Sequence, residues 1–328
     1  MKVSVLIVNW NSKEYVRRCL ETIQATCGDH PLQIVVVDGG SFDGCGEMLA
    51  QEFPEVEFVQ VPENVGFGRS NNLGFERVTG ETLLLLNPDC ELQPGSVQSL
   101  LAKLEKLPAA GLVGPRILNT DGTLQTSCVR AFPTPLNQAL GSDWLHRRFP
   151  SARLWGNWEA FQSPVPSEVD VLSGACMLLR SQTFRKVGGF SAEFFMYGED
   201  IDLCYKVRHL GLRNYYDPGA QVIHHGGQSS NQQFKSFSIV LMRESDQVVM
   251  RKWQGVWAAT MYRVLMALSA VLRLGVLVPA LLIARPEMRL QRGHAVMKWR
   301  AILRWALGLE PWSRQYTNPE VFTQAVTR

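Results

Sequence analysis

Apolar blocks alternate with more polar segments through the first third of the chain. Four blocks rich in Val, Ile and Leu are typical of strands buried on both faces, and they cover residues 3–8, 33–37, 56–61 and 83–86. Segments that we expect to be helices follow, at about 13–26, 47–52 and 92–107. This alternation predicts an α/β protein with a mostly parallel central sheet flanked by helices.

Polar residues follow three of these strands, at 9–12, 38–44 and 87–89. In open α/β sheets, ligands bind just outside the carboxyl ends of the strands, so these segments are expected to line a nucleotide-binding crevice. Asp38 and Asp43 offer acceptors for the donors of a base or ribose. The alternative interpretation is a tight turn, because Asp, Gly and Ser are the usual turn residues.

Asp89 stands just after the fourth strand, in the sequence Asn87-Pro88-Asp89. A lone carboxylate at this edge of a sheet is a candidate contact for a metal or a phosphate. Asn-Pro-Asp is equally good turn chemistry. These residues alone leave both interpretations open.

A glycine-containing loop follows the third strand. Gly66 and Gly68 suggest a dinucleotide fingerprint, but the third glycine is missing at position 71 and the loop does not follow the first strand. We therefore reject a Rossmann dehydrogenase. The two glycines allow close approach to a diphosphate, to which Arg69 offers donors. The alternative is a capped helix start with a surface arginine.

The second half of the chain has a less regular pattern. Residues 114–133 are expected to form a hairpin with its turn at Asp121-Gly122. Residues 169–180 restore a strand pattern. Between them, residues 135–166 are irregular and rich in tryptophan, which is typical either of a binding loop or of a surface excursion.

Acidic residues and a histidine pair in this half have the chemistry of a site. Glu199, Asp200 and Asp202 begin a predicted helix, where acids also stabilise the positive end of the helix dipole without any catalytic role. His224 and His225 follow another short strand. A neutral imidazole binds first-row metals, although such a pair is more often structural.

Charge is concentrated near the C-terminal end. The chain of 328 residues has a net charge of +3, but residues 251–304 carry ten Lys or Arg against one Glu, so this segment is +9 and the remainder is −6. Residues 257–284 are strongly apolar but contain Arg263, Arg273 and Pro279. A membrane-spanning helix is possible there but not favoured.

The segment that follows predicts an amphipathic helix. One face carries the apolar residues Ala295, Val296, Trp299, Ile302, Leu303, Ala306 and Leu307, flanked by Lys298, Arg300 and Arg304. Such a helix can lie in the interface of an anionic membrane. The alternative is that these helices pack on the rest of the protein or form a dimer contact.

Cysteine usage and the N-terminus bear on the compartment. Seven scattered cysteines without a Cys-x-x-Cys pair indicate reduced thiols rather than a disulfide framework or a zinc cluster. The first apolar run is too short for a signal peptide. We expect a cytoplasmic protein, and we predict no nucleic-acid partner.

The ordered set of motifs resembles one enzyme family. The segments 3–11, 38–44, 64–74, 86–89, 188–204 and 224–229 are similar to those of family-2 glycosyltransferases of GT-A fold, and to the rhamnosyltransferase subgroup in particular. The resemblance covers about residues 2–230. The chain departs from the family pattern at three positions: Gly39 replaces a frequent Asn, Asn87 replaces the first acid of the Asp-x-Asp motif, and Ser191 replaces a frequent Asp.

The resemblance implies roles for particular residues. Asp200 matches the catalytic base, with Glu199 beside it in the catalytic pair, and Asp89 and His224 match the ligands of Mg²⁺ or Mn²⁺ bound with the sugar-nucleotide diphosphate. The implied contacts to the nucleotide sugar are Asn9, Asp38, Ser41, Asp43, Asn64, Gly66, Arg69, Asn72 and Asp89. With a single acid at 87–89, the cation is expected to bind weakly without the donor.

These expectations combine into one hypothesis. Residues 1–235 form a GT-A catalytic domain, with a nucleotide-sugar half at 1–115 and an acceptor half at 116–235, and residues 236–328 form a basic helical extension associated peripherally with the inner face of the cell membrane. The enzyme inverts the anomeric centre as it moves L-rhamnose from dTDP-L-rhamnose to a glycan or polyprenyl-linked acceptor. The alternatives are a UDP-hexose donor or a non-catalytic, nucleotide-binding pseudo-transferase.

Overall fold

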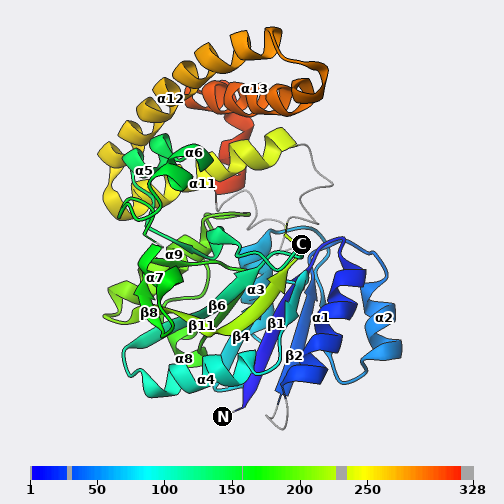
Figure 1. The fold of residues 1–328 in the computed structure, drawn as a ribbon. Coiled ribbons are helices and arrows are strands. Elements are labelled where there is room, and N and C mark those ends of the chain that lie inside the picture. The colour runs from blue at the N-terminus through cyan, green and yellow to red at the C-terminus, as the bar shows by residue number, and fades with distance from the viewer. Residues whose placement is uncertain (1, 28–31, 157, 227–234, 319–328) are drawn as a thin grey trace.

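The protein is built around one mixed sheet, seen in a computed structural model that describes residues 2–27, 32–156, 158–226 and 235–318 (Figure 1). The strand order is β3-β2-β1-β4-β10-β6-β11-β5, and β8 pairs with β11. Following the chain, β2 and β3 lie on one side of β1, and β4 lies on its other side. The carboxyl ends of β1 and β4 therefore open onto a crevice at a topological switch point.

The first half of the sheet is parallel, as expected from its apolar blocks. It contains β1 (Val3–Asn9), β2 (Leu32–Asp38), β3 (Glu57–Gln60) and β4 (Thr82–Leu86), in which β1 pairs with β2 and β4 in parallel. Every residue of β1 and β4 is buried. The helices α1 (Lys13–Thr26), α2 (Cys45–Glu52) and α3 (Phe67–Phe75) connect these strands.

The second half is mixed rather than parallel. β10 (Cys176–Arg180) runs antiparallel to both β4 and β6 (Ala110–Leu118), and β11 (Arg213–His224) runs parallel to β6. The antiparallel edge strands β5 (Cys90–Leu92) and β8 (Ser167–Val169) pair with β11. The expected helix at 92–107 is α4 (Ser96–Lys106), which begins later because the residues after Asp89 pair with β11.

Short elements fill the less regular part of the sequence. The predicted turn is present, since Gly122 donates its N–H to the carbonyl of Asn119 at 2.9 Å, but the second arm of the hairpin is only a Leu118–Leu124 bridge. The chain continues through elements that mostly have too few residues for a periodic pattern: η1 (Thr126–Cys128), β7 (Val129–Arg130), α5 (Pro135–Leu140), α6 (Asp143–Arg148), α7 (Trp158–Gln162), β9 (Val171–Leu172), α8 (Ser181–Lys186) and α9 (Glu199–His209).

Three helices and a short 3₁₀ turn end the described chain. They are α11 (Lys235–Gln254), α12 (Val256–Leu282), α13 (Pro286–Ala306) and η2 (Pro311–Thr317). In Figure 1, α12 and α13 stand as a pair beyond α11, on the far side of it from the sheet. α12 is long and apolar enough to cross a membrane by length and composition.

The amphipathic stripe of α13 faces inward, contrary to its expected place in the membrane interface. Trp299, Ile302 and Trp305 are buried in a second hydrophobic cluster with residues of α11 and α12. The exposed apolar residues of α12 include Val264, Leu268, Leu272 and Val276. The spacing of four residues places these on one side of the helix.

The two arginines of the apolar helix α12 hold other helix ends. Arg263 donates to the carbonyls of Trp305 and Ala306 at the end of α13, at 2.6 and 2.9 Å. Arg273 donates to the carbonyls of Ala139 and Gly141 at the end of α5, at 3.3 and 3.0 Å. Cations stabilise the free carbonyls of helix C-termini, so these contacts fix α12 to its neighbours.

Candidate active site

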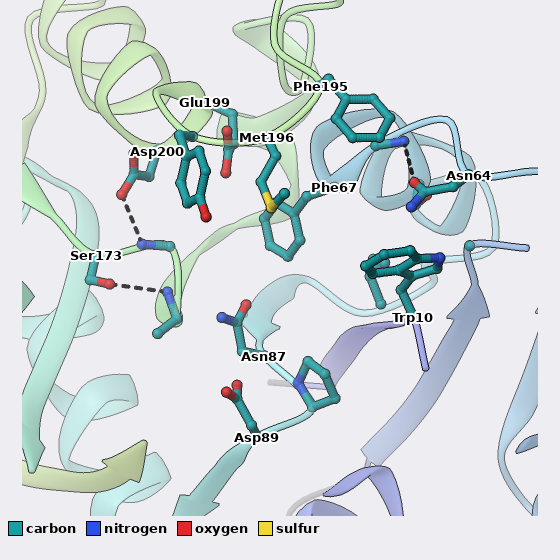
Figure 2. Close-up of a pocket in the computed structure, with 18 of the residues that line it drawn as sticks. Trp10, Asn64, Phe67, Asn87, Asp89, Ser173, Phe195, Met196, Glu199 and Asp200 are labelled. Carbon is teal, nitrogen blue, oxygen red and sulfur yellow. Dashed lines mark hydrogen bonds between the residues drawn. The ribbon is translucent and has the colours of Figure 1, made fainter. Parts of the chain in front are cut away.

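A cavity of about 310 Å³ lies at the carboxyl ends of β1 and β4 (Figure 2). Asn87 and Asp89 point into it from one side, and Glu199 and Met196 from the opposite side. The cavity brings together six of the sequence-predicted site residues: Asn64, Gly66, Asp89, Glu199, Asp200 and His224. The loop after β4 therefore forms a turn and also lines this cavity.

Asp89 and His224 form one side of this cavity. The Nε2 atom of His224 lies 3.2 Å from Oδ1 of Asp89, and its Nδ1 atom lies 2.8 Å from Oε1 of Gln125. The Gln125 oxygen can accept a hydrogen bond from Nδ1. In the tautomer with its proton on Nδ1, Nε2 turns a lone pair toward the Asp89 carboxylate, the arrangement in which both groups can bind one cation.

The donor atoms around this pair fit a divalent cation. Among the described residues, the buried Oδ1 atom of Asn87 has no hydrogen-bond partner, and it lines the same cavity. Carboxylate and amide oxygens with one imidazole suit Mg²⁺ or Mn²⁺. Cys90 also lies within reach, but burial raises the pKa of its thiol well above the usual value and Sγ donates to the Ala175 carbonyl, so it is not a ligand of such an ion.

Asp200 lies at the start of α9 and is held by three donors. Arg130 donates from Nη2 to Oδ2 at 2.8 Å, the N–H of Gly174 donates to the same oxygen at 3.3 Å, and the N–H of Ile201 donates to Oδ1 at 2.8 Å. The carboxylate remains partly exposed at the cavity. These bonds hold the Asp200 side chain in one orientation at the cavity.

Glu199 has a different environment from Asp200. Burial, and after it the negative charge of Asp200, raise the pKa of Glu199 to about 8. Its Oε2 atom is buried and has no hydrogen-bond partner among the residues that the structure describes. At neutral pH the Glu199 carboxyl is protonated, so it can donate a hydrogen bond into the cavity but cannot accept a proton.

The third acid of α9 has a structural role. Asp202 is fully buried and accepts hydrogen bonds from Ser191 Oγ at 2.6 Å and from Trp253 Nε1 at 2.8 Å. Lys252 Nζ lies 3.0 Å from it. Asp202 therefore attaches α9 to α11 and does not face the cavity.

Gly66 forms a close contact at the start of α3. Its φ is +90°, and a Cβ atom at this position would lie 2.3 Å from the carbonyl oxygen of Phe195. The same oxygen accepts a hydrogen bond from the N–H of Phe67 at 2.8 Å. Only glycine meets both conditions, so the glycine of this loop serves the contact between α3 and the segment before α9.

The segment at Phe195 is also held by η2. The N–H of Phe195 donates to the carbonyl of Tyr316 at 3.3 Å, and the two rings lie 5.0 Å apart. Phe195 lines the cavity. The C-terminal extension thus contributes to the wall of the site.

Four of the predicted nucleotide contacts form a hydrogen-bonded cluster beside the cavity, in which Asn9 and Asp38 are buried. Asn9 Nδ2 donates to Asp38 Oδ2 at 3.0 Å, to Ser41 Oγ at 3.2 Å and to Asp43 Oδ1 at 3.2 Å. Asp38 also accepts from the N–H and the hydroxyl of Ser41, each at 2.7 Å. Gly39 reaches the cavity, whereas these four side chains do not line it. Their direct contact with a nucleotide stays a prediction.

Two other predicted contacts point away from the cavity. Arg69 Nη2 donates to the carbonyl of Ala192 at 2.5 Å. The Asn72 side chain both donates to and accepts from the backbone of Phe190, at 2.8 and 2.9 Å, which ties α3 to the loop before α9. Asn64, in contrast, lines the cavity and accepts from the N–H of Gly66 at 2.9 Å.

Several residues of the site had no signal in the sequence. Trp10 and Tyr197 line the cavity, and Tyr197 has a φ of +70°, which is rare for a residue with a side chain and is typical of functional sites. Arg130 and Gln125 contact site residues that lie 70 and 99 positions away in the chain. Of the predicted motif at 224–229, Gly227 and Ser229 lie outside the described residues.

The chain matches known proteins in both sequence and structure. Residues 4–188 match the model of glycosyl transferase family 2. The chain is 30% identical over 241 residues to the N-acetylglucosaminyl-diphospho-decaprenol L-rhamnosyltransferase of Mycobacterium tuberculosis, covering 69% of this chain and 76% of that protein. It is 25% identical over 233 residues to the rhamnosyltransferase WbbL of Escherichia coli, covering 68% and 83%.

Solved structures share the fold at lower identity. The mannosyltransferase PcManGT from Pyrobaculum calidifontis, in complex with GDP-Man and Mn²⁺, matches with a TM-score of 0.56 at 16% identity, covering 94% of this chain and 87% of that one. GalNAc-T7 with UDP, GalNAc and Mn²⁺ matches with a TM-score of 0.51, covering 68% and 44%. These likenesses confirm the expected GT-A fold.

Proposed function

Since the chain belongs to glycosyltransferase family 2, we propose that it is an inverting transferase that moves L-rhamnose from dTDP-L-rhamnose to a saccharide carried on a polyprenyl diphosphate. The observation that carries this proposal is the single cavity in which Asp89 and His224 lie on one side and Asp200 on another. A site with a cation-binding pair and an oriented carboxylate suits transfer from a sugar diphosphate. A protein that only binds a nucleotide has no need of the oriented carboxylate.

The donor occupies the cavity at the ends of β1 and β4 in this proposal. Its diphosphate lies against Asp89 and His224, and its base lies toward Trp10 and Asn64, which offer an aromatic face and an amide (Figure 2). The hydrogen-bonded cluster of Asn9, Asp38 and Asp43 keeps the strand ends in position beneath it.

Asp200 is the proposed base. A hydroxyl oxygen of the acceptor attacks the anomeric carbon from the face opposite the diphosphate, and its proton passes to the Asp200 carboxylate as the bond from carbon to diphosphate oxygen breaks. Arg130 keeps this carboxylate oriented. Glu199, protonated at neutral pH, donates a hydrogen bond to a sugar hydroxyl and is the second member of the catalytic pair.

Asp89, His224 and the amide oxygen of Asn87 are the proposed ligands of Mg²⁺ or Mn²⁺. A divalent cation, when bound, neutralises the charge that develops on the leaving diphosphate. Gln125 sets the tautomer of His224 and thus the direction of its lone pair.

With a lipid-linked acceptor, the proposed place of the reaction is the cytoplasmic face of the membrane. We propose that α12 lies on the membrane rather than across it, because Arg263 and Arg273 are engaged with neighbouring helix ends. Its exposed apolar face then contacts lipid, and the exposed cations Arg285, Arg289, Lys298 and Arg300 favour anionic headgroups.

Product analysis tests the function. The full chain is incubated with Mn²⁺, a short-chain prenyl diphosphate of N-acetylglucosamine, and in turn dTDP-L-rhamnose, UDP-N-acetylglucosamine, UDP-glucose and GDP-mannose. We expect a rhamnosyl product of inverted anomeric configuration from the first donor. Transfer from a UDP-hexose alone would replace the donor assignment, and the absence of any product from the four would contradict the proposed enzyme.

A further inference from the structure

A second cavity, of about 560 Å³, lies between the segment of α5 to α7 and helix α11. We infer that this cavity binds the sugar of the acceptor, an inference that rests on the proposed function and names the part of the chain that recognises the second substrate. Three observations support this inference. The cavity adjoins the proposed base, its side chains suit a sugar, and one of its ends contacts helix α12.

Within the described part of the chain, the two cavities share no lining residue, but an ion pair at the proposed base connects their walls. Arg130 lines the second cavity and donates to Asp200, which lines the first, across 2.8 Å. The Nε atom of Arg130 is buried and has no hydrogen-bond partner among the described residues. A hydroxyl held near this arginine would therefore lie next to the carboxylate that must take its proton.

The side chains of the second cavity suit a neutral saccharide. Trp158 and Phe161 offer aromatic faces for the apolar side of a sugar ring, and Gln138 offers an amide for its hydroxyls. The charged pair at the back of the cavity is balanced, since Arg243 Nη1 lies 3.4 Å from Asp246 Oδ2. A balanced pair with aromatic faces does not select a free polyanion, so the sugar itself is the expected occupant.

The far end of the cavity rests on the apolar helix. Gly141, at the end of α5, lines the cavity, and its carbonyl accepts from Arg273 of α12 at 3.0 Å. Ser269 of α12 donates to the carbonyl of Ala139 at 2.8 Å. The face of α12 that carries Leu272 is exposed and apolar. The cavity thus extends from Arg130, which contacts the base, to Gly141, which contacts the helix proposed to lie on the membrane. A lipid-linked sugar requires this direction.

Three variants of the full chain test this assignment. Trp158→Ala removes an aromatic face, and Ser127→Trp, at an exposed residue that lines the cavity, fills part of its space. Trp144→Ala is the matched control, because Trp144 is an exposed tryptophan of the same segment that does not line the cavity. The probe is the short-chain prenyl diphosphate of N-acetylglucosamine, and its affinity is measured by isothermal titration calorimetry.

We expect Trp158→Ala to weaken probe binding about tenfold, Ser127→Trp to weaken it at least as much, and Trp144→Ala to leave it within about twofold. Affinity for dTDP, measured in parallel, should be unchanged in all three, which also shows that the first cavity is intact. Equal probe affinity in all variants, or no binding by the wild type at millimolar probe, overturns the inference.

Failure of the proposed function has a different signature. If the wild type forms no product from any donor but the two cavity variants still bind the probe more weakly than the wild type does, the acceptor site is supported and the proposed transfer reaction is wrong. If transfer proceeds and the cavity variants keep wild-type probe affinity and acceptor KM, the function stands and this site is wrong.

Discussion

Gln125 accepts a hydrogen bond from Nδ1 of His224 at 2.8 Å, and this bond leaves Nε2 of the histidine facing Asp89. The glutamine is itself held, since its Nε2 atom donates to Asn119 Oδ1 at 3.2 Å. Outer partners of this kind set the tautomer and direction of a ligating imidazole. Asn119 and Gln125 flank the turn after β6, so this turn supports the pair of Asp89 and His224 that we propose as cation ligands.

Loss of the Gln125 bond should weaken cation binding. We expect Gln125→Leu to lower the affinity for Mn²⁺ about 10- to 100-fold in the presence of dTDP, because the imidazole is no longer held in one tautomer. Electron paramagnetic resonance of free Mn²⁺ measures this without any turnover. Gln24→Leu, on the outer side of α1, is the control and should bind as the wild type does. Without nucleotide, the wild type itself should bind Mn²⁺ weakly; tight binding would contradict the ligand set.

Glu199 should make stability fall as pH rises. Its carboxyl has a pKa of about 8 in the folded protein, against an ordinary glutamate pKa of 4.5 in the unfolded chain. Between these values, the folded state therefore binds more protons than the unfolded state does. Stability contributed by the bound proton is therefore lost as pH rises toward about 8. Glu199→Gln, which keeps a neutral group there, should flatten this slope in urea unfolding at pH 5 to 8. An unchanged slope would show that Glu199 is ionised at neutral pH.

Asp200 and Arg130 should affect turnover more than donor binding. Asp200→Asn is expected to lower kcat about 10²- to 10⁴-fold, since the acceptor proton has no base to receive it. Arg130→Met should lower kcat less, because it leaves the base in place but not oriented. Affinity for dTDP should stay within about twofold in both. Asp121→Asn, in the exposed turn, is the control. Full kcat in Asp200→Asn would show that another group is the base.

Gly66 should tolerate no side chain. Gly66→Ala places a Cβ against the Phe195 carbonyl and in a positive-φ conformation, so we expect a loss of more than about 2 kcal/mol in unfolding free energy or a displaced loop with weak dTDP binding. Gly275→Ala is the opposite case, because a Cβ there meets open space within helix α12. That variant should gain about 0.5–1 kcal/mol. Equal effects of the two would refute the packing argument.

Membrane attachment should depend on α12. The double variant Leu272→Glu and Val276→Glu places two charges on the exposed apolar face. We expect the variant protein no longer to float with phosphatidylglycerol vesicles. Leu210→Glu, an exposed leucine at the end of α9, should float as the wild type does. Flotation that survives the double variant would move the contact to another surface.

The parts of the fold that the sequence predicted are those with a strong local pattern. Leu83–Leu86 form a buried central strand, and the polar residues after it lie at a cavity, because the apolar run and the strand-end rule both act over a few residues. The helices α5 to α7 were missed because each has at most six residues, too few to show a period.

The unpredicted parts of the site depend on contacts between distant segments. Arg130 reaches Asp200 only because β7 pairs with β9, and Gln125 reaches His224 only because β6 lies beside β11. The stripe of α13 was assigned to lipid because an amphipathic pattern shows that a face is covered but not what covers it. Whether Asn9, Asp38, Arg69 and Asn72 touch the donor was likewise not decidable from residue type.

The contact between Phe195 and Tyr316 has a consequence for how the enzyme is made. A cavity whose other walls come from residues 8 to 224 acquires its last support from a residue near the end of the described chain. Contacts of such long sequence separation form late in folding. The sheet can therefore assemble during synthesis while the donor site remains unfinished, and the protein should gain affinity for nucleotide only after η2 has left the ribosome and docked.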